Sequence, residues 1–230
     1  MEPELGTLFI VGTPIGNLED VTMRALRILK EADVIFCEDT RVTKRLLQRY
    51  EIGTRTTSLN ARTEHAKVGS VVGALMEGKK VALVTDAGTP GISDPGGIVV
   101  SKVRERLPDV RIEAIPGPSA LTSALSIAGM PVADFVFLGF LPHKKGRQTL
   151  FKEMEESERA TIFYESPHRI MKTLVSLAET LDDTRTVVIA RELTKIYEEI
   201  VRGSAQEVLT YFETNTDKQR GEFVVMVSGA

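Results

Sequence analysis

The chain has 230 residues, a formal net charge of −3 and 42% hydrophobic residues, which is enough apolar content for one large core or two compact ones. No apolar run approaches the roughly 18 to 20 residues needed to cross a bilayer, and the amino terminus lacks the pattern of a secretory signal, so we expect a cytoplasmic protein. The single cysteine, Cys37, excludes an internal disulfide, and three scattered histidines disfavour a metal site.

Apolar runs typical of buried strands alternate with helical patterns along the chain, which indicates an α/β fold. The predicted strands are 8–11, 34–37, 81–84, 112–115, 135–138, 161–164, 187–190 and 223–227, with an additional, antiparallel strand over 196–202. Apolar spacing predicts helices over 22–32, 66–76 and 119–128. Two further helix starts are predicted at Ser166-Pro167 and at Ser204, which has capping-box spacing with Glu207.

The stretch Pro116-Gly117-Pro118 interrupts the pattern near the middle of the chain. We therefore predict two α/β lobes with a ligand cleft between them. The first, residues 1–115, carries a Gly/Pro-rich binding loop, and the second, residues 116–230, completes the ligand site.

The binding loop follows the apolar run 81–84 and extends from Thr85 to Gly97. An ordinary connection between a strand and a helix needs only two to six residues. Glycine allows close approach of a ligand to the backbone, and ligands of open α/β sheets lie at the carboxyl ends of strands. The excess length therefore favours a binding function.

Several familiar motifs are absent. The sequence contains no G-x-x-x-x-G-K-[ST], no G-x-G-x-x-G after the first strand and no G-x-S-x-G, which disfavours nucleoside triphosphate hydrolysis, ordinary NAD binding and an α/β-hydrolase. Polar loops after the predicted strands instead mix carboxylates, amides and cations. Together they indicate a cleft for a large organic ligand with hydroxyls and charges.

Basic residues gather in two segments despite the acidic total. The first contains Arg41, Lys44, Arg45, Arg49 and Arg55, and the second contains His143, Lys144, Lys145 and Arg147. Both follow predicted strands, so they would lie at a ligand-binding edge of a sheet. The alternative interpretation is a pair of solvated surfaces.

Six motifs, TPIGNLED, EDTR, DAGTPGISDPG, PGPSA, FYESPHR and ARELTK, resemble in this order the bacterial 16S ribosomal RNA (cytidine) 2′-O-methyltransferases of the tetrapyrrole-methylase fold class. The resemblance extends from about Gly6 to Val227. It implies S-adenosylmethionine (SAM) as methyl donor, a two-lobed α/β fold, a donor site between the lobes and a homodimer. Members often carry a helical extension after the last strand, whereas this sequence ends at Ala230.

The resemblance also implies donor-binding residues. They are Pro14, Asp86, Ala87, Gly88, Thr89, Pro90, Ser119, Ala120, Tyr164, Ala190 and Arg191. Backbone groups of the glycine-rich loop would hold the amino-acid part of the donor, and Asp86 would accept a hydrogen bond or offset the sulfonium charge. Since side chains of a strand alternate between its faces, we expect one of Phe163 and Tyr164 to lie in the core.

Methyl transfer to a ribose 2′-hydroxyl requires in-line placement and a route for the proton. We favour Asp39 with Arg41 as the catalytic pair, although a structural ion pair is an equal alternative. Other candidate proton acceptors are Glu64, His65, Glu165 and His168, with Arg169, Arg191 and Lys195 as phosphate or ribose contacts. The predicted RNA-binding residues are Arg41, Lys44, Arg45, Arg49, Lys144, Lys145 and Arg147.

Two other functions share these features. One is a porphyrinoid C-methyltransferase with the same fold, whose acidic substrate would also suit the arginines. The other is a module that senses the donor and binds RNA without catalysis. The basic segment 41–55 favours RNA, whose phosphodiester backbone is negatively charged, and we expect this RNA to lie within the small ribosomal subunit. A homodimer would extend the basic surface across both subunits. The strand ends near 135–140 would then lie at or near the dimer contact.

Overall fold

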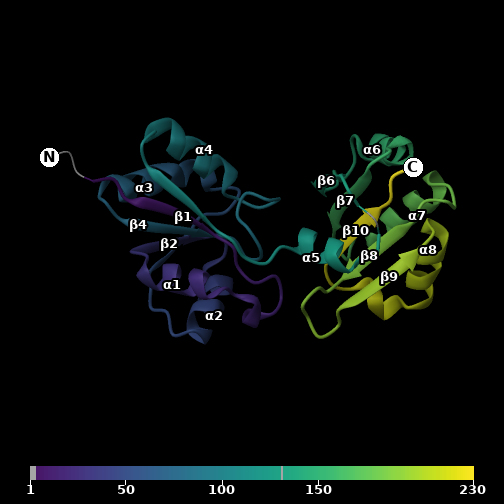
Figure 1. The fold of residues 1–230 in the computed structure, drawn as a ribbon, viewed down its shortest axis with the longest axis horizontal. Helices are drawn as coiled ribbons and strands as arrows, with labels where there is room; N and C mark the ends of the chain where they lie inside the picture. The colour runs from purple at the N-terminus through teal and green to yellow at the C-terminus, as the bar shows by residue number, and fades with distance from the viewer. Residues whose placement is uncertain (1–3, 131) are drawn as a thin grey trace. The chain divides into compact units, whose positions relative to one another are not determined.

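The computed structural model describes residues 4–130 and 132–230 (Figure 1). The chain divides into two compact units, the first ending at Ser119 and the second running from Ala120 to Ala230. The Pro-Gly-Pro stretch thus belongs to the first unit, whereas the predicted boundary preceded it. In the described residues no helix is both long and apolar enough to cross a membrane.

The first unit is a parallel sheet between two layers of helices (Figure 1). Its strands are β1 (Thr7–Val11), β2 (Val34–Cys37), β3 (Thr56–Ser58), β4 (Lys80–Val84) and β5 (Arg111–Ile115). Its helices are α1 (Met23–Glu31), α2 (Thr40–Arg49), α3 (Glu64–Met76) and α4 (Gly97–Arg106), with a short 3-10 helix at Leu18–Asp20.

The strands of this sheet are apolar in consecutive positions because both faces are buried. Alternate residues of β4 show this: Ala82 and Val84 pack with α1 and α2, whereas Val81 and Leu83 pack with α3 and α4. The carboxyl ends of all five strands lie at one edge, because every pairing is parallel.

The strand order, β3-β2-β4-β1-β5, determines where that edge opens. Strand β2 connects onward to β3 on one side, whereas its neighbour β4 connects to β5 on the other. Adjacent strands whose connections diverge in this way form the crevice where open α/β sheets bind ligands. The fold therefore places the start of α2 and the glycine-rich loop on the two sides of this point.

The second unit is a mixed sheet of order β6-β7-β10-β8-β9, in which only β6 and β7 pair in parallel. Its strands are β6 (Phe135–Phe140), β7 (Ala160–Glu165), β8 (Val187–Arg191), β9 (Glu199–Gly203) and β10 (Phe223–Val227). Its helices are α5 (Ala120–Ile127), α6 (Arg147–Glu156), α7 (Ile170–Thr180) and α8 (Ala205–Thr214), with a 3-10 helix at Thr216–Gln219.

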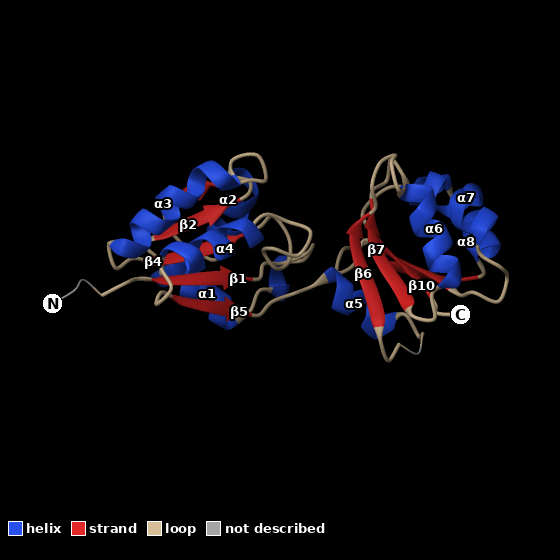
Figure 2. Cartoon of the chain, turned by 90° about the horizontal axis from the view of Figure 1, so that it is seen from above, coloured by secondary structure: helices blue, strands red, loops and turns tan. Residues whose placement is uncertain are grey.

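Helices cover the two faces of this sheet unequally (Figure 2). Helices α6, α7 and α8 bury the main core on one face, which includes Phe151, Phe163 and Phe212. Helix α5 packs against β10 on the other face. The capping box predicted at Ser204 and Glu207 is confirmed at the start of α8.

The local structure differs from the predicted elements in the following places. Strand β3 was not predicted, since Thr56–Ser58 is short, polar and at the sheet edge. Helix α7 begins at Ile170 and not at Pro167, because Ser166–Arg169 first forms a turn in which the Ser166 carbonyl accepts from the N–H of Arg169. The antiparallel strand after β8 is confirmed, but it begins at Glu199, three residues after the predicted start at Ile196.

Candidate functional site

Three loops meet at the carboxyl edge of the first sheet. Thr13, after β1, and Gly88, after β4, exchange two backbone hydrogen bonds of 2.9 and 3.0 Å. The hydroxyl of Thr13 also donates toward the carbonyls of Thr85 and Gly88. Gly12 lies so close to Gly117, after β5, that a Cβ on either residue would come within 2.9 Å of the other's backbone. The loops are therefore held together by backbone contacts.

The glycine-rich loop is fixed at both ends. Its first half is held by Thr13 and turns at Gly88, where φ is +78°. Its second half is held by Glu64, whose buried Oε1 accepts from the N–H groups of Gly96 (2.8 Å), Ile98 (3.1 Å) and Val99 (3.2 Å). Glu64 thus serves as the cap of α4, which makes it a structural group and not the proton acceptor considered above.

A small pocket of about 40 Å³ lies between α2 and the segments that follow β1 and β4. Its lining combines apolar side chains of the first loop and α2 with polar groups that follow β1 and β4: Thr13, Pro14, Leu18, Val42, Thr43, Leu46, Thr85 and Asp86. Two predicted donor-binding residues, Pro14 and Asp86, are among them. Thr13 also lines the pocket, although it was not predicted from the sequence. Its position next to Pro14, at the end of β1, could have indicated it.

Three carboxylates and one guanidinium follow β2 and β4. The Asp86 Oδ1 accepts from the N–H of Asp39 (3.0 Å). Burial, and to a smaller extent the charge of Asp39, raise the pKa of Asp86. Burial and the Asp86 charge likewise raise the pKa of Glu38. Hydrogen bonds from Arg41 instead lower the pKa of Asp39 to about 2.

Asp39 and Arg41 form the ion pair that the sequence suggested, with 2.5 Å between Arg41 Nη2 and Asp39 Oδ2. Asp39 is also the N-cap of α2, because its Oδ1 accepts from the N–H of Arg41 at 2.8 Å. The Arg41 side chain is 86% exposed. A carboxylate with a pKa of about 2 has little affinity for a proton near neutral pH, so this geometry suits orientation of Arg41 better than proton transfer.

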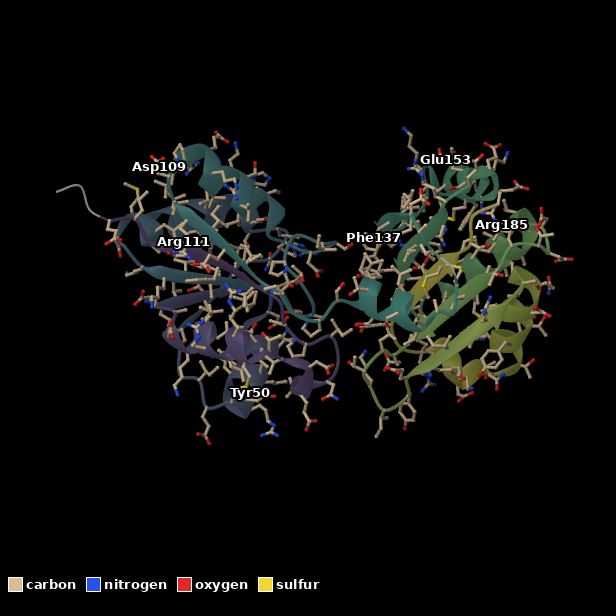
Figure 3. All side chains as sticks on the ribbon, in the orientation of Figure 1. Tyr50, Asp109, Arg111, Phe137, Glu153 and Arg185 are labelled. Atoms are coloured by element: carbon tan, nitrogen blue, oxygen red, sulfur yellow. The ribbon has the colours of Figure 1, made fainter. Side chains whose placement is uncertain are left out.

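Helix α2 separates its side chains by face. Thr43, Leu46 and Leu47 are buried against the sheet. The exposed face carries the predicted RNA-binding residues Arg41, Lys44, Arg45 and Arg49. The Arg49 guanidinium lies over the ring of Tyr50, which Figure 3 labels, at 5.7 Å from the ring centre. We refer to this exposed side as the basic face of α2.

Two predicted donor-binding residues of the second unit lie in one row across its sheet. Tyr164 of β7 and Ala190 of β8 both pair with Val224 of β10, so the three side chains share one face. The main core on the opposite face contains Phe163, which confirms that one residue of the Phe163-Tyr164 pair is in the core. Tyr164 packs edge-on against Phe137 (Figure 3) and Phe140 of β6.

Arg191 lies on the other face of β8, and its guanidinium binds protein groups. It donates to the carbonyls of Arg220 (2.8 Å) and Tyr197 (3.3 Å) and lies 3.9 Å from Glu199. Lys195, another candidate phosphate contact, pairs with Glu192 and Glu222, each at 2.8 Å. These cations are thus engaged within the second unit.

The second basic segment divides into two parts. His143, Lys144 and Lys145 are exposed. Arg147, predicted to contact RNA, is only 11% exposed and pairs with buried Glu165, which also pairs with Arg169. The prediction for Arg147 is therefore corrected, and Glu165 and Arg169 likewise serve internal contacts. The two other candidate acceptors, His65 and His168, are exposed.

Solved structures share this fold. CobJ, a methyltransferase, matches 98% of this chain and 95% of its own with a TM-score of 0.70 and 22% identity. A cobalt precorrin-4 methyltransferase, CbiF, matches 97% and 94% with a TM-score of 0.66 and 19% identity. At such identities the likeness shows the fold alone.

The family follows from the sequence comparison. The family model for tetrapyrrole (corrin/porphyrin) methylases matches residues 7–209, and the chain belongs to this family. "Ribosomal RNA small subunit methyltransferase I" of Thermotoga maritima is 45% identical, over 98% of this chain and 99% of its own. The protein of the same name from Escherichia coli O157:H7 is 44% identical, over 97% of this chain and 78% of its own.

Proposed function

We propose that this protein transfers a methyl group from SAM to the 2′-hydroxyl of a cytidine ribose in 16S ribosomal RNA. The observation that carries the proposal is the 45% identity, over nearly the full length of both chains, to a relative named as a small-subunit ribosomal RNA methyltransferase. The two solved methyltransferases are 22% identical or less. Fold likeness at that level does not extend to substrate, so the porphyrinoid alternative is not favoured.

The first unit supplies groups that suit SAM, whose sulfonium provides the activated methyl group. Residues 86–90, from Asp86 to Pro90, form the start of a loop fixed by Thr13 and Glu64. Gly88, with φ of +78°, lets this loop turn tightly, and the carboxylate of Asp86, which lines the same pocket as Pro14, suits a positive charge. Ser119, Ala120, Tyr164, Ala190 and Arg191 stay predictions as donor contacts.

Gly88→Val is expected to weaken SAM binding by about tenfold or more. A Cβ at this position would meet its nearest neighbour, the Ile15 side chain, at an ordinary 3.6 Å, so the penalty comes from the φ of +78°, which a β-branched residue avoids. Isothermal titration with SAM measures the change.

The matched control is Gly73→Ala on α3, where φ is not left-handed and a Cβ would enter open space. This variant should bind SAM like the parent and be slightly more stable, since alanine favours helices. Unchanged affinity of a folded Gly88→Val protein would remove the loop from the donor site.

Asp39 and Arg41 are proposed as the catalytic pair. Because the pKa of Asp39 is held at about 2 by Arg41, we assign the carboxylate to orienting the guanidinium. Arg41 would then polarise the ribose or contact the adjacent phosphate, and placement of the 2′-hydroxyl in line with the methyl group would supply most of the acceleration.

Two basic surfaces are proposed to bind RNA phosphates. One is the basic face of α2, with Arg41, Lys44, Arg45 and Arg49. The other is the loop that carries Lys144 and Lys145. Both are exposed, as groups that replace counterions along a phosphodiester backbone must be.

A single assay tests the function. The protein is incubated with labelled SAM and unmethylated small ribosomal subunits, and the label is mapped by nuclease digestion. Label on the 2′-oxygen of one cytidine is the expected result. Bound donor without transfer would support a non-catalytic module, and transfer to a porphyrinoid but not to RNA would support the corrin alternative.

We further propose a homodimer that works in the cytoplasm, where its ribosomal substrate is assembled. Phe135 and Phe140, at the two ends of edge strand β6, are 40% and 54% exposed. Light scattering at micromolar concentration should give about twice the chain mass of 25.3 kDa. A monomer with full activity at that concentration would show that the dimer is dispensable.

A further inference from the structure

The loop between β6 and α6 has an exposed tip and an anchored base. Its tip contains His143, Lys144 and Lys145, all exposed, and we call residues 142–146 the basic loop. At its base the carbonyl of Leu141 accepts from Arg169 Nη2 (2.6 Å), and the carbonyl of Pro142 accepts from Arg147 Nη1 (3.4 Å). Two guanidinium groups therefore fix the point where the chain leaves β6.

A buried carboxylate holds both guanidinium groups. The Glu165 side chain is fully buried and lies at the end of β7. Its Oε2 is 3.3 Å from Arg147 Nη2, and its Oε1 is 3.1 Å from Arg169 Nε. Thr173 of α7 completes the network by donating to Glu165 Oε2 at 2.6 Å and accepting from Arg147.

The charges of this network favour anions nearby. Two guanidinium groups share one carboxylate, so positive charge remains in excess at the base of the loop, where both side chains are largely shielded from water. Arg147 is further held by the ring of Phe151, 5.2 Å from its charge centre. Three of its five donors bind Glu165, Thr173 and Pro142, and the side chain is only 11% exposed, so Arg147 is poorly placed to bind a phosphate itself.

We propose that Glu165, Arg147 and Arg169 form a brace that presents the basic loop to the phosphates of the RNA substrate. In this arrangement Lys144 and Lys145 contact the phosphates, whereas Arg147 and Arg169 are positioning residues that act through the loop. The inference rests on the proposed function, since that function supplies the RNA.

Arg169→Lys and Arg147→Lys test the brace with least risk to folding. Lysine keeps a cation beside Glu165, but it lacks the second guanidinium nitrogen, which donates to a loop carbonyl. Affinity for unmethylated small ribosomal subunits should fall about five- to tenfold, while SAM affinity stays unchanged. The slope of log affinity against log salt should decrease by roughly 1 to 2, because each lost phosphate contact contributes about 0.7 to 0.9.

A readout without RNA measures the positioning directly. Hydrogen exchange at the amides of Arg147 and Leu150, which donate to the carbonyls of Lys144 and Gly146 in the loop, should be faster in Arg169→Lys than in the parent, with exchange in the core strand β10 unchanged. If Arg169→Lys does not fold, the same comparison uses Arg147→Lys. Parental exchange at these amides in a folded variant would overturn the brace.

A double-mutant cycle separates positioning from direct contact. Combined with Lys144→Gln/Lys145→Gln, Arg169→Lys should cost nothing further in RNA affinity, because the loop it positions has already lost its charges. The matched control combines Arg169→Lys with Arg45→Gln/Arg49→Gln on the basic face of α2, where the two effects should add. Additive losses in both combinations would show that Arg169 contacts RNA itself, which contradicts the brace.

Failure of this inference and failure of the proposed function give different results. If the parent methylates small subunits but Lys144→Gln/Lys145→Gln binds them like the parent, the basic loop is no RNA surface and only the inference fails. If the parent neither binds nor methylates them, the proposed function fails, and the inference falls with it.

Discussion

Glu64→Ala is expected to lower the free energy of unfolding by about 2 to 4 kcal/mol and to weaken SAM binding by tenfold or more. The change removes the acceptor of the Gly96, Ile98 and Val99 N–H groups. Each orphaned buried donor costs about 1 to 3 kcal/mol, and water that enters the space recovers part of the sum. The glycine-rich loop then loses one of its two fixed ends. Urea unfolding and titration with SAM measure the two effects.

The matched control is Glu207→Ala, which removes the carboxylate of another helix cap. Glu207 accepts from the N–H of Ser204 at the start of α8, on an exposed surface. The variant should lose about 1 kcal/mol of stability and bind SAM like the parent. Glu64→Gln, which keeps an oxygen acceptor, should fall between Glu64→Ala and the parent. If Glu64→Ala lowers stability but leaves SAM affinity intact, the loop either stays ordered without Glu64 or does not bind the donor.

The strands of this fold could be predicted because burial dictates their composition. In the first sheet both faces are covered, so β4 is apolar at four consecutive positions, from Val81 to Val84, and such runs are legible without a structure. Strand β3 carries no such signal, because an edge strand of three polar residues forms only through its pairing with β2. Pairing is a property of the tertiary fold and leaves no periodicity in a short segment.

The roles of the polar residues of the candidate site could not be predicted from the sequence alone. Glu64, Glu165 and Arg147 occupy strand ends or helix starts in the sequence, and nothing in their spacing distinguishes a ligand contact from an internal one. The structure separates them by burial: Glu165 is fully buried between two arginines, whereas Lys144, three residues before Arg147, is exposed. A cation in such a loop is therefore a candidate for RNA binding only if it is not already paired with a buried carboxylate, as Arg147 is with Glu165.

Three carboxylates, Glu38, Asp39 and Asp86, follow β2 and β4, and the structure disfavours the ionised form of two of them. Burial raises the pKa of both Glu38 and Asp86, helped by the charge of Asp86 on Glu38 and by that of Asp39 on Asp86. Of these three carboxylates, only Asp39 is paired with a cation, Arg41. A folded state that raises the pKa of an acid binds protons more tightly than the unfolded chain does. The contribution of these two groups to the free energy of unfolding therefore falls as pH rises through their titration. Ionisable groups with perturbed pKa values cluster at functional sites.

Asp39→Asn is expected to reduce the rate of methyl transfer by roughly ten- to hundredfold at saturating SAM and RNA. Asparagine caps helices as well as aspartate does, so its oxygen should still accept from the Arg41 N–H, and α2 should begin at the same residue. What disappears is the charge that holds the Arg41 guanidinium, and with it the orientation that we propose for its contact with the ribose or phosphate. Single-turnover kinetics with labelled SAM measure the rate, and titration should show SAM affinity within about twofold of the parent.

The control for this variant is Glu31→Gln, which breaks the exposed Arg27–Glu31 ion pair of α1 and should leave the rate unchanged. If Asp39 acts only through Arg41, then Arg41→Gln should be as slow as Asp39→Asn, and combining the two should slow the reaction no further. The pH profile of the parent separates this role from proton transfer: a carboxylate with a pKa of about 2 is ionised throughout the range from pH 5 to 8, so its titration should not appear there. A folded Asp39→Asn protein with the parental rate would reduce the pair to a helix cap and a surface ion pair without a role in methyl transfer.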